Sequence, residues 1–185
     1  MTDSTFPFRM RVKARIAFAN GLFDPYVDSA TGRRSWKAIA VELAQKDVDA
    51  AWKLVDEHLR TTLGGKFTRR QLKQCFIHDG AEKAQYPGFE EGKPYFSLSS
   101  SSDRAFRVVD GTRRDITRED GIIYSGCHCL FIFDVYAQNK PGQGPQVNAA
   151  LKGVQFLSDG EPLSGGSAVR DDEFETLEEE DDVFA

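Results

Sequence analysis

The sequence contains few residues that form disulfides or bind metals, and it contains no long apolar run. Its 185 residues include three cysteines and three histidines. An odd number of cysteines without framework spacing argues against a disulfide-stabilised secreted domain and fits a reducing compartment. No apolar stretch reaches transmembrane length and no secretory signal opens the chain, so we expect a cytoplasmic protein with no membrane partner.

Motifs of nucleotide hydrolysis and covalent catalysis are also absent. No glycine-rich loop precedes a predicted helix, and the serine run 99–102 has neither a nucleophile elbow nor an evident base partner. In Cys127-His128-Cys129 the histidine points away from the two thiols if the segment is a strand, so the triplet does not suit one metal ion. We expect two buried thiols there. The sequence predicts no enzyme, no cofactor and no metal.

The charges are divided unevenly along the chain. The last fifteen residues hold nine acids and no base, so residues 1–170 carry a formal charge of +4 although the whole chain carries −5. A basic body with an acidic tail indicates nucleic acid or another polyanion as partner. The tail is too acidic and too poor in apolar residues to fold alone.

Hydrophobic periodicity divides the chain into short strands and one clear helix. Val48, Ala51, Val55 and Leu59 recur at helical spacing after Asp47, a candidate N-cap, and Gly64–Gly65 closes the helix. A polar excursion over 65–94 is long enough to be functional. Strands are expected at 8–18, 35–43, 95–100, 102–111, 121–138 and 146–157.

This pattern predicts a mainly β protein with one or two helices. Short strands joined by turns are typical of a small barrel, and a barrel with one helix and long loops is compatible with the oligonucleotide-binding (OB) fold. We expect an OB-fold nucleic-acid-binding domain over 1–166 and a disordered acidic tail over 167–185. We expect the protein to be a monomer or a weak homodimer.

Strand 8–18 alternates between an apolar and a cationic face. The apolar face, from Phe8 to Phe18, is expected to enter the core, and the cations of the other face could lie along an anion. Elsewhere aromatic residues stand beside cations, the combination that binds single-stranded nucleic acid. The predicted contacts are Arg11, Lys13, Arg15, Trp36, Lys37, Tyr95, Arg104, Phe106, Arg107, Tyr124 and Tyr136.

The tail can then compete with nucleic acid for a basic groove and recruit partner proteins. Its end offers acids for steering and an apolar anchor, through Asp181, Asp182, Val183 and Phe184. Two other functions stay open. Acids in turns could form a metal-dependent nuclease or junction-resolvase site, from Asp79, Asp103, Asp110, Asp115, Glu119, Asp120 and Asp134. Alternatively, the chain is a protein adaptor that acts through the tail alone.

Several segments resemble a phage-encoded single-stranded-DNA-binding family once catalogued as a domain of unknown function. They are FANGLFDP (18–25), KPYF (93–96), IIYSGCHCLFIFDVYAQ (122–138) and the stretch from Asn148 through LKGVQFLSDGEPLSGG to Gly166. The resemblance implies an OB fold, single-stranded DNA and replication or recombination proteins as partners, no enzymatic activity, and a place in the host cytoplasm. The chain ends Val-Phe-Ala, whereas familiar tails of this kind end on Phe itself.

Overall fold

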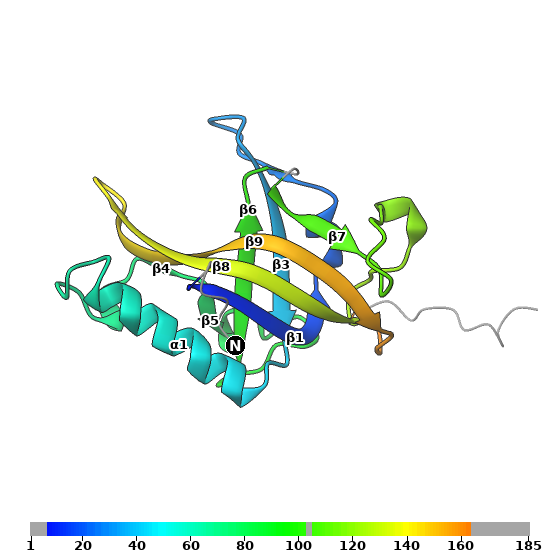
Figure 1. The fold of residues 1–185 in the computed structure, drawn as a ribbon, viewed down its shortest axis with the longest axis horizontal. Helices are drawn as coiled ribbons and strands as arrows, with labels where there is room; N and C mark the ends of the chain where they lie inside the picture. Colours follow the sequence, from blue (N-terminus) through cyan, green and yellow to red (C-terminus); the bar gives the residue numbers. More distant parts are fainter. Residues whose placement is uncertain (1–6, 103–104, 164–185) are drawn as a thin grey trace, which may run out of the picture.

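Five strands close into a barrel in the computed structural model, which describes residues 7–102 and 105–163 (Figure 1). Strand β1 (Arg9–Ala17) pairs antiparallel with β3 (Arg34–Val41) and with β8 (His128–Lys140). Strand β8 pairs antiparallel with β9 (Gly144–Ser158), and β3 pairs antiparallel with β6 (Pro94–Ser100). Strands β6 and β9 meet in parallel through the single pair Ser99 and Ala150, and this closes the ring.

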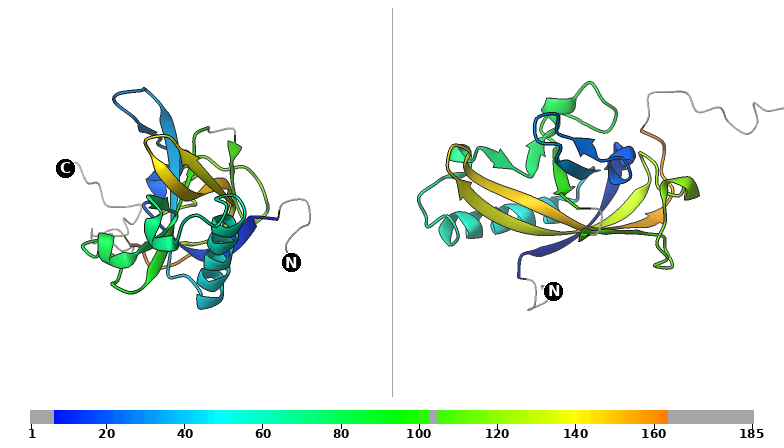
Figure 2. Two further views of the ribbon diagram at one scale, coloured as in Figure 1. Left: turned by 90° about the vertical axis from the view of Figure 1, so that its left-hand side faces the viewer. Right: turned by 90° about the horizontal axis from the view of Figure 1, so that it is seen from above.

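Two hairpins project beyond the barrel. Strand β2 (Tyr26–Val27) and the start of β3 form one hairpin, and the long strands β8 and β9 form the other. Figure 2 shows both from two sides, the first in blue and the second in yellow. Short strands line the barrel rim: β4 (Gln74–Cys75) and β7 (Arg107–Val109) pair with β9, and β5 (Ile77–Asp79) pairs with β6.

One α-helix, α1 (Gln45–Arg60), lies along the barrel beside β8 (Figure 1). Its buried stripe includes Ala51, Val55 and Leu59, which join the main core, as the helical spacing predicted. Short 3-10 turns lie at Ala19–Leu22, Arg69–Gln71, Gly80–Lys83 and Arg118–Asp120. No helix in the described part of the chain is long and apolar enough to cross a membrane.

The barrel interior is filled by the alternate side chains of its strands. Val12 and Ile16 of β1, Phe96 of β6 and Phe131 and Phe133 of β8 are fully buried. The rings of Phe76, Phe96 and Phe133 meet edge to face at centroid distances of 5.3–6.0 Å, a favoured aromatic geometry. The mainly β fold class and the small closed barrel are therefore confirmed.

Three details of the elements differ from the sequence-based expectation. The predicted strand 121–138 begins only at His128, because Gly126 turns the chain with a φ of 114°. The predicted strand 102–111 shrinks to β7, since Asp110 accepts hydrogen bonds from Thr112 and Arg114 and forms a turn. Ala44, not Asp47, is the N-cap of α1; Asp47 lies in the first turn, where a carboxylate favours the helix dipole.

Phe18 also departs from its expected place in the core. It follows β1 in the left-handed backbone conformation, with φ 52° and ψ 50°. This conformation is uncommon for a residue with a side chain. It interrupts the alternation of the strand, and the Phe18 side chain is 41% exposed.

Candidate nucleic-acid interface

Three adjoining hollows lie over the outer faces of β3 and β6. Their volumes are about 890, 1020 and 720 Å³. The first two share Arg33, Ser99 and Tyr136, and the first and third share Lys37 and Ser97. We call the three together the β3–β6 groove. The β2–β3 hairpin, the β8–β9 hairpin and the segment 72–89 form its walls.

All four exposed Phe, Tyr and Trp side chains of the described residues line this groove. They are Phe18, Tyr26, Tyr86 and Tyr136, with exposed fractions of 41%, 62%, 44% and 39%. Phe18 packs edge-on against Tyr86 at a centroid distance of 5.1 Å and is stacked on the buried Phe89 at 5.7 Å. An exposed ring that keeps one face free offers a platform for a nucleobase.

Seven cations line the same groove against two acids, Asp28 and Glu82. The cations are Arg33, Arg34, Lys37, Lys73, Lys83, Lys140 and Lys152. Within the described residues, no ion pair of 4.0 Å or less engages any of the seven. Lys37 and Lys83 lie 5.8 Å from the ring centroids of Tyr26 and Phe18, so charge and aromatic faces alternate along the groove.

The two acids are both held by neighbouring groups. Asp28 accepts hydrogen bonds from the backbone N–H and the hydroxyl of Thr31, which lower the pKa of its carboxyl. Glu82 accepts from Nδ1 of His78 at 3.1 Å and from the hydroxyl of Tyr95 at 3.3 Å. Burial and the neighbouring Glu82 raise the pKa of Tyr95 to about 12. The imidazole of His78 stacks on the ring of Tyr95 at a centroid distance of 5.0 Å. Tyr95 thus supports the imidazole, which is a further flat surface in the groove.

The structure places two of the sequence-predicted contact residues openly in the groove. Lys37 is exposed on the outer face of β3, and Tyr136 lies where the first two hollows meet. Tyr95 lines the third hollow but is 3% exposed, because Phe89 and His78 cover its ring. It is therefore a support of the groove wall and does not present a free stacking face.

Other predicted contact residues lie away from the groove. Trp36 and Phe106 are buried in the main core, with ring centroids 6.4 Å apart, because Trp36 has the opposite parity to Lys37 on β3. Arg107 pairs with Asp115 at 2.9 Å. The hydroxyl of Tyr124 lies within hydrogen-bond distance of Asp159 and of the backbone oxygen of Gly160 and accepts from the Gly160 N–H, so this side chain fixes the chain after β9.

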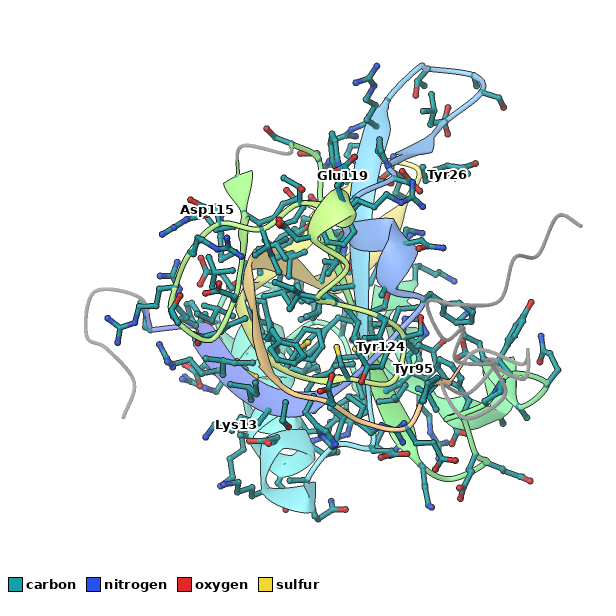
Figure 3. All side chains as sticks on the ribbon, turned by 90° about the vertical axis from the view of Figure 1, so that its right-hand side faces the viewer. Lys13, Tyr26, Tyr95, Asp115, Glu119 and Tyr124 are labelled. Carbon is teal, nitrogen blue, oxygen red and sulfur yellow. The ribbon has the colours of Figure 1, made fainter. Side chains whose placement is uncertain are left out.

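The cationic face of β1 lies on another side of the barrel. Figure 3 shows Lys13 and Tyr26 at opposite ends of the molecule. Arg15 pairs with Glu42 at 2.8 Å and donates to the backbone oxygen of Gly126, whereas Arg11 and Lys13 are exposed. Arg11, Lys13 and Arg15 are thus not among the residues that line the β3–β6 groove, and their contact with nucleic acid stays a prediction. Arg104 and the tail residues Asp181, Asp182, Val183 and Phe184 lie outside the described residues.

The candidate metal ligands are used elsewhere in the described structure. Asp134 pairs with Arg9 at 2.7 Å, and Asp110 and Asp120 accept hydrogen bonds from Thr112 and Thr117 in turns. In residues 7–102 and 105–163, no group of three or more His, Cys, Asp or Glu is placed to hold a metal ion. The thiols of Cys127 and Cys129 are buried and 3.6 Å apart, as expected for core thiols. Their hydrogen bond lowers the pKa of Cys127 and raises that of Cys129.

The sequence-based list missed most of the groove. The β2–β3 hairpin carries Tyr26, Arg33 and Arg34. Its sequence has no regular alternation of apolar and polar residues from which its conformation could be predicted. Lys73, Lys83 and Tyr86 belong to the excursion 65–94, whose length and basic, aromatic character were the available signal.

The fold and groove together define an OB-fold protein, a class that binds oligonucleotides and oligosaccharides over the second and third strands of its barrel. Here those strands are β3 and β6. A family model described as the single-stranded-DNA-binding protein of Enterobacter phage Enc34 matches residues 12–184, so the chain belongs to this family.

The chain is also similar to one curated phage protein in sequence and to solved structures in fold. Protein p50 of Acyrthosiphon pisum secondary endosymbiont phage 1 is 28% identical over an alignment of 192 positions, which covers 95% of this chain and 100% of p50. The Enc34 protein in complex with single-stranded DNA superposes with a TM-score of 0.67 at 21% identity, over 85% of this chain and 90% of that one. The single-stranded-DNA-binding protein gp2.5 of bacteriophage T7 gives 0.54 at 15% identity, over 94% and 96%.

Proposed function

We propose that this protein binds single-stranded DNA along the β3–β6 groove with little sequence preference, in phage DNA replication or recombination. The observation that carries the proposal is that one groove holds every exposed Phe and Tyr ring of the described residues together with seven cations outside ion pairs. Aromatic faces stack any base, and cations follow the phosphates. The shared fold of the Enc34 protein, which was solved with single-stranded DNA, supports it.

The salt dependence of binding measures how many of these cations touch phosphates. Each contact to a single strand lowers the slope of log K against log salt by about 0.7, so all seven would give roughly −5. Both tryptophans lie away from the groove, since Trp36 is in the core and Trp52 is a residue of α1 whose ring lies under Arg69. Fluorescence anisotropy of a labelled oligo-dT is therefore a better signal than tryptophan quenching.

A titration of oligo-dT and of a duplex of equal length, each at several salt concentrations, tests the proposal. We expect tighter binding of the single strand, because stacking platforms need unpaired bases. Equal affinity for both forms, or a slope near zero, would remove the groove as a single-strand site. Cleavage of the labelled strand on addition of Mg²⁺ would favour the nuclease alternative instead.

We further propose two roles for the acidic segment 171–185: competition with DNA for the groove, and recruitment of replication or recombination proteins through Asp181, Asp182, Val183 and Phe184. Its charge is opposite to that of the groove cations. Leu163, the last described residue, lines the third hollow, so the chain leaves the described structure beside the groove. Binding by a chain truncated after Arg170, compared with the full chain, tests the first role.

A further inference from the structure

Three amide side chains form a hydrogen-bonded cluster in the wall of the groove. Gln138 lies on β8 directly opposite Gln146 of β9, and Tyr136 lies directly opposite Asn148. The side chain of Gln146 is buried, at 4% exposure, while Gln138 and Asn148 are half-buried. All three amides and Tyr136 line the first hollow.

The buried carbonyl of Gln146 fixes the orientation of the other two amides. Nε2 of Gln138 donates to Oε1 of Gln146 at 3.0 Å, and Nδ2 of Asn148 donates to the same oxygen at 3.2 Å. An amide that directs its nitrogen at one partner turns its oxygen to the other side, because the group is planar. Gln138 and Asn148 are thus held with their oxygens, which only accept hydrogen bonds, away from Gln146.

This cluster lies within reach of a base stacked on Tyr136. Directly opposed residues of an antiparallel pair have Cβ atoms about 4.5–5.5 Å apart, so a base on the Tyr136 ring extends its edge over Asn148. Oxygen acceptors match an exocyclic amino group, which cytosine carries at position 4. Thymine and uracil carry a carbonyl oxygen there, and an oxygen facing an oxygen makes no hydrogen bond.

We propose that Gln138, Gln146 and Asn148 form a base-edge subsite beside Tyr136 that favours cytosine over thymine or uracil. The inference rests on the proposed binding of single-stranded DNA in the groove. One net hydrogen bond corresponds to a preference of about three- to tenfold at one position. The other platforms stack bases of any kind, so the protein as a whole still tolerates any sequence.

The test compares homopolymers of deoxycytidine and deoxyuridine about ten nucleotides long, within the site size of an OB fold. The two pyrimidines differ in the groups at position 4 and N3, and neither carries the thymine methyl group. Competition against a labelled strand at slightly alkaline pH gives the ratio of their dissociation constants. We expect deoxycytidine to bind about three- to tenfold tighter to the full chain.

Gln146→Met should bring this ratio close to one, because the thioether fills the space of the amide but cannot accept both N–H groups. Asn148→Ala is the second variant, should the first fail to fold. Gln45→Met is the matched control: this glutamine is exposed on α1 and donates to Asp49, so its replacement should leave the ratio unchanged.

The outcomes separate this inference from the proposed function. If the full chain binds both homopolymers equally, or prefers deoxyuridine, the subsite is refuted while groove binding stands. An unequal ratio that survives both Gln146→Met and Asn148→Ala refutes it as well, and would point to Lys73 and Lys140, which line the same hollow. If the chain binds neither homopolymer, the proposed function itself fails.

Discussion

A pair of matched double variants distinguishes the groove from the cationic face of β1. Arg33→Ala/Lys37→Ala removes two cations of the β3–β6 groove, and Arg11→Ala/Lys13→Ala removes two exposed cations of β1. Both variants change the net charge by −2. They differ only in where the charge is lost, and at 0.15 M salt charges further apart than about 8 Å are largely screened from one another.

The structure sets the size of the expected difference. Two phosphate contacts correspond to a change of about 1.4 in the salt slope, from −5 to about −3.6 if all seven cations engage. At 0.1 M salt the same two contacts amount to about a 25-fold loss of affinity, taking their contribution at 1 M as zero. The β1 variant should keep the slope of the parent chain and lose less than about threefold, since its cations lie on another side of the barrel.

Fluorescence anisotropy of labelled oligo-dT, titrated at four or more salt concentrations, gives both slopes. Circular dichroism and urea midpoints should show that both variants remain folded, because all four replaced side chains are exposed. Equal changes of slope in the two variants would refute the assignment of the groove. A larger change of the salt slope in the β1 variant would instead support the prediction that the alternating cations of β1 bind the DNA strand.

Three further outcomes follow from the same contacts. Tyr136→Ala should weaken binding about 5- to 150-fold, the loss of one stacked base, without changing the salt slope, whereas Tyr124→Phe, outside the groove, should bind like the parent chain in the same anisotropy assay. Removal of 171–185 should tighten DNA binding at low salt and have little effect at high salt, and an unchanged affinity would contradict competition by the tail. Because the pKa of Tyr95 is raised from 10.0 to about 12, its contribution to stability is present below pH 10 and is lost as the pH rises towards 12; urea midpoints should therefore fall less for Tyr95→Phe than for the parent chain over that range.

Sequence periodicity predicted which side chains of the regular strands and of the helix are buried. It identified the apolar face of β1 and the stripe of α1, because each follows from which side of a regular element faces water. The rule does not place Trp36, because both faces of β3 are buried in part: Trp36 shares the inner face with Ala38 and Ala40, while Lys37 shares the outer face with the buried Ile39 and Val41. Proximity to a cation was therefore a poor criterion for a stacking residue, since neighbours along a strand point to opposite faces.

The remaining groove residues depend on loops and on tertiary contacts. Phe18 continues the alternation of β1 and should be buried by that pattern, yet its left-handed backbone turns the ring outwards. Tyr95 has the parity of an exposed residue on β6, but Phe89 and His78 from the long excursion cover it. Neither result follows from a local pattern, because each depends on segments that meet only in the folded chain.

The closure of the barrel has a mechanical consequence. Strands β8 and β9 are paired along their whole length, whereas β6 and β9 meet through the single pair Ser99 and Ala150. This seam is the weakest point of the ring, and local opening draws on the least stable contacts of a fold. Ser99 also belongs to the groove, and Tyr136 and Asn148 lie just across the seam. A nucleic acid strand that contacts residues on both sides of the β6–β9 seam would hold the two strands together. Its binding should therefore slow amide hydrogen exchange at this seam more than anywhere else in the barrel.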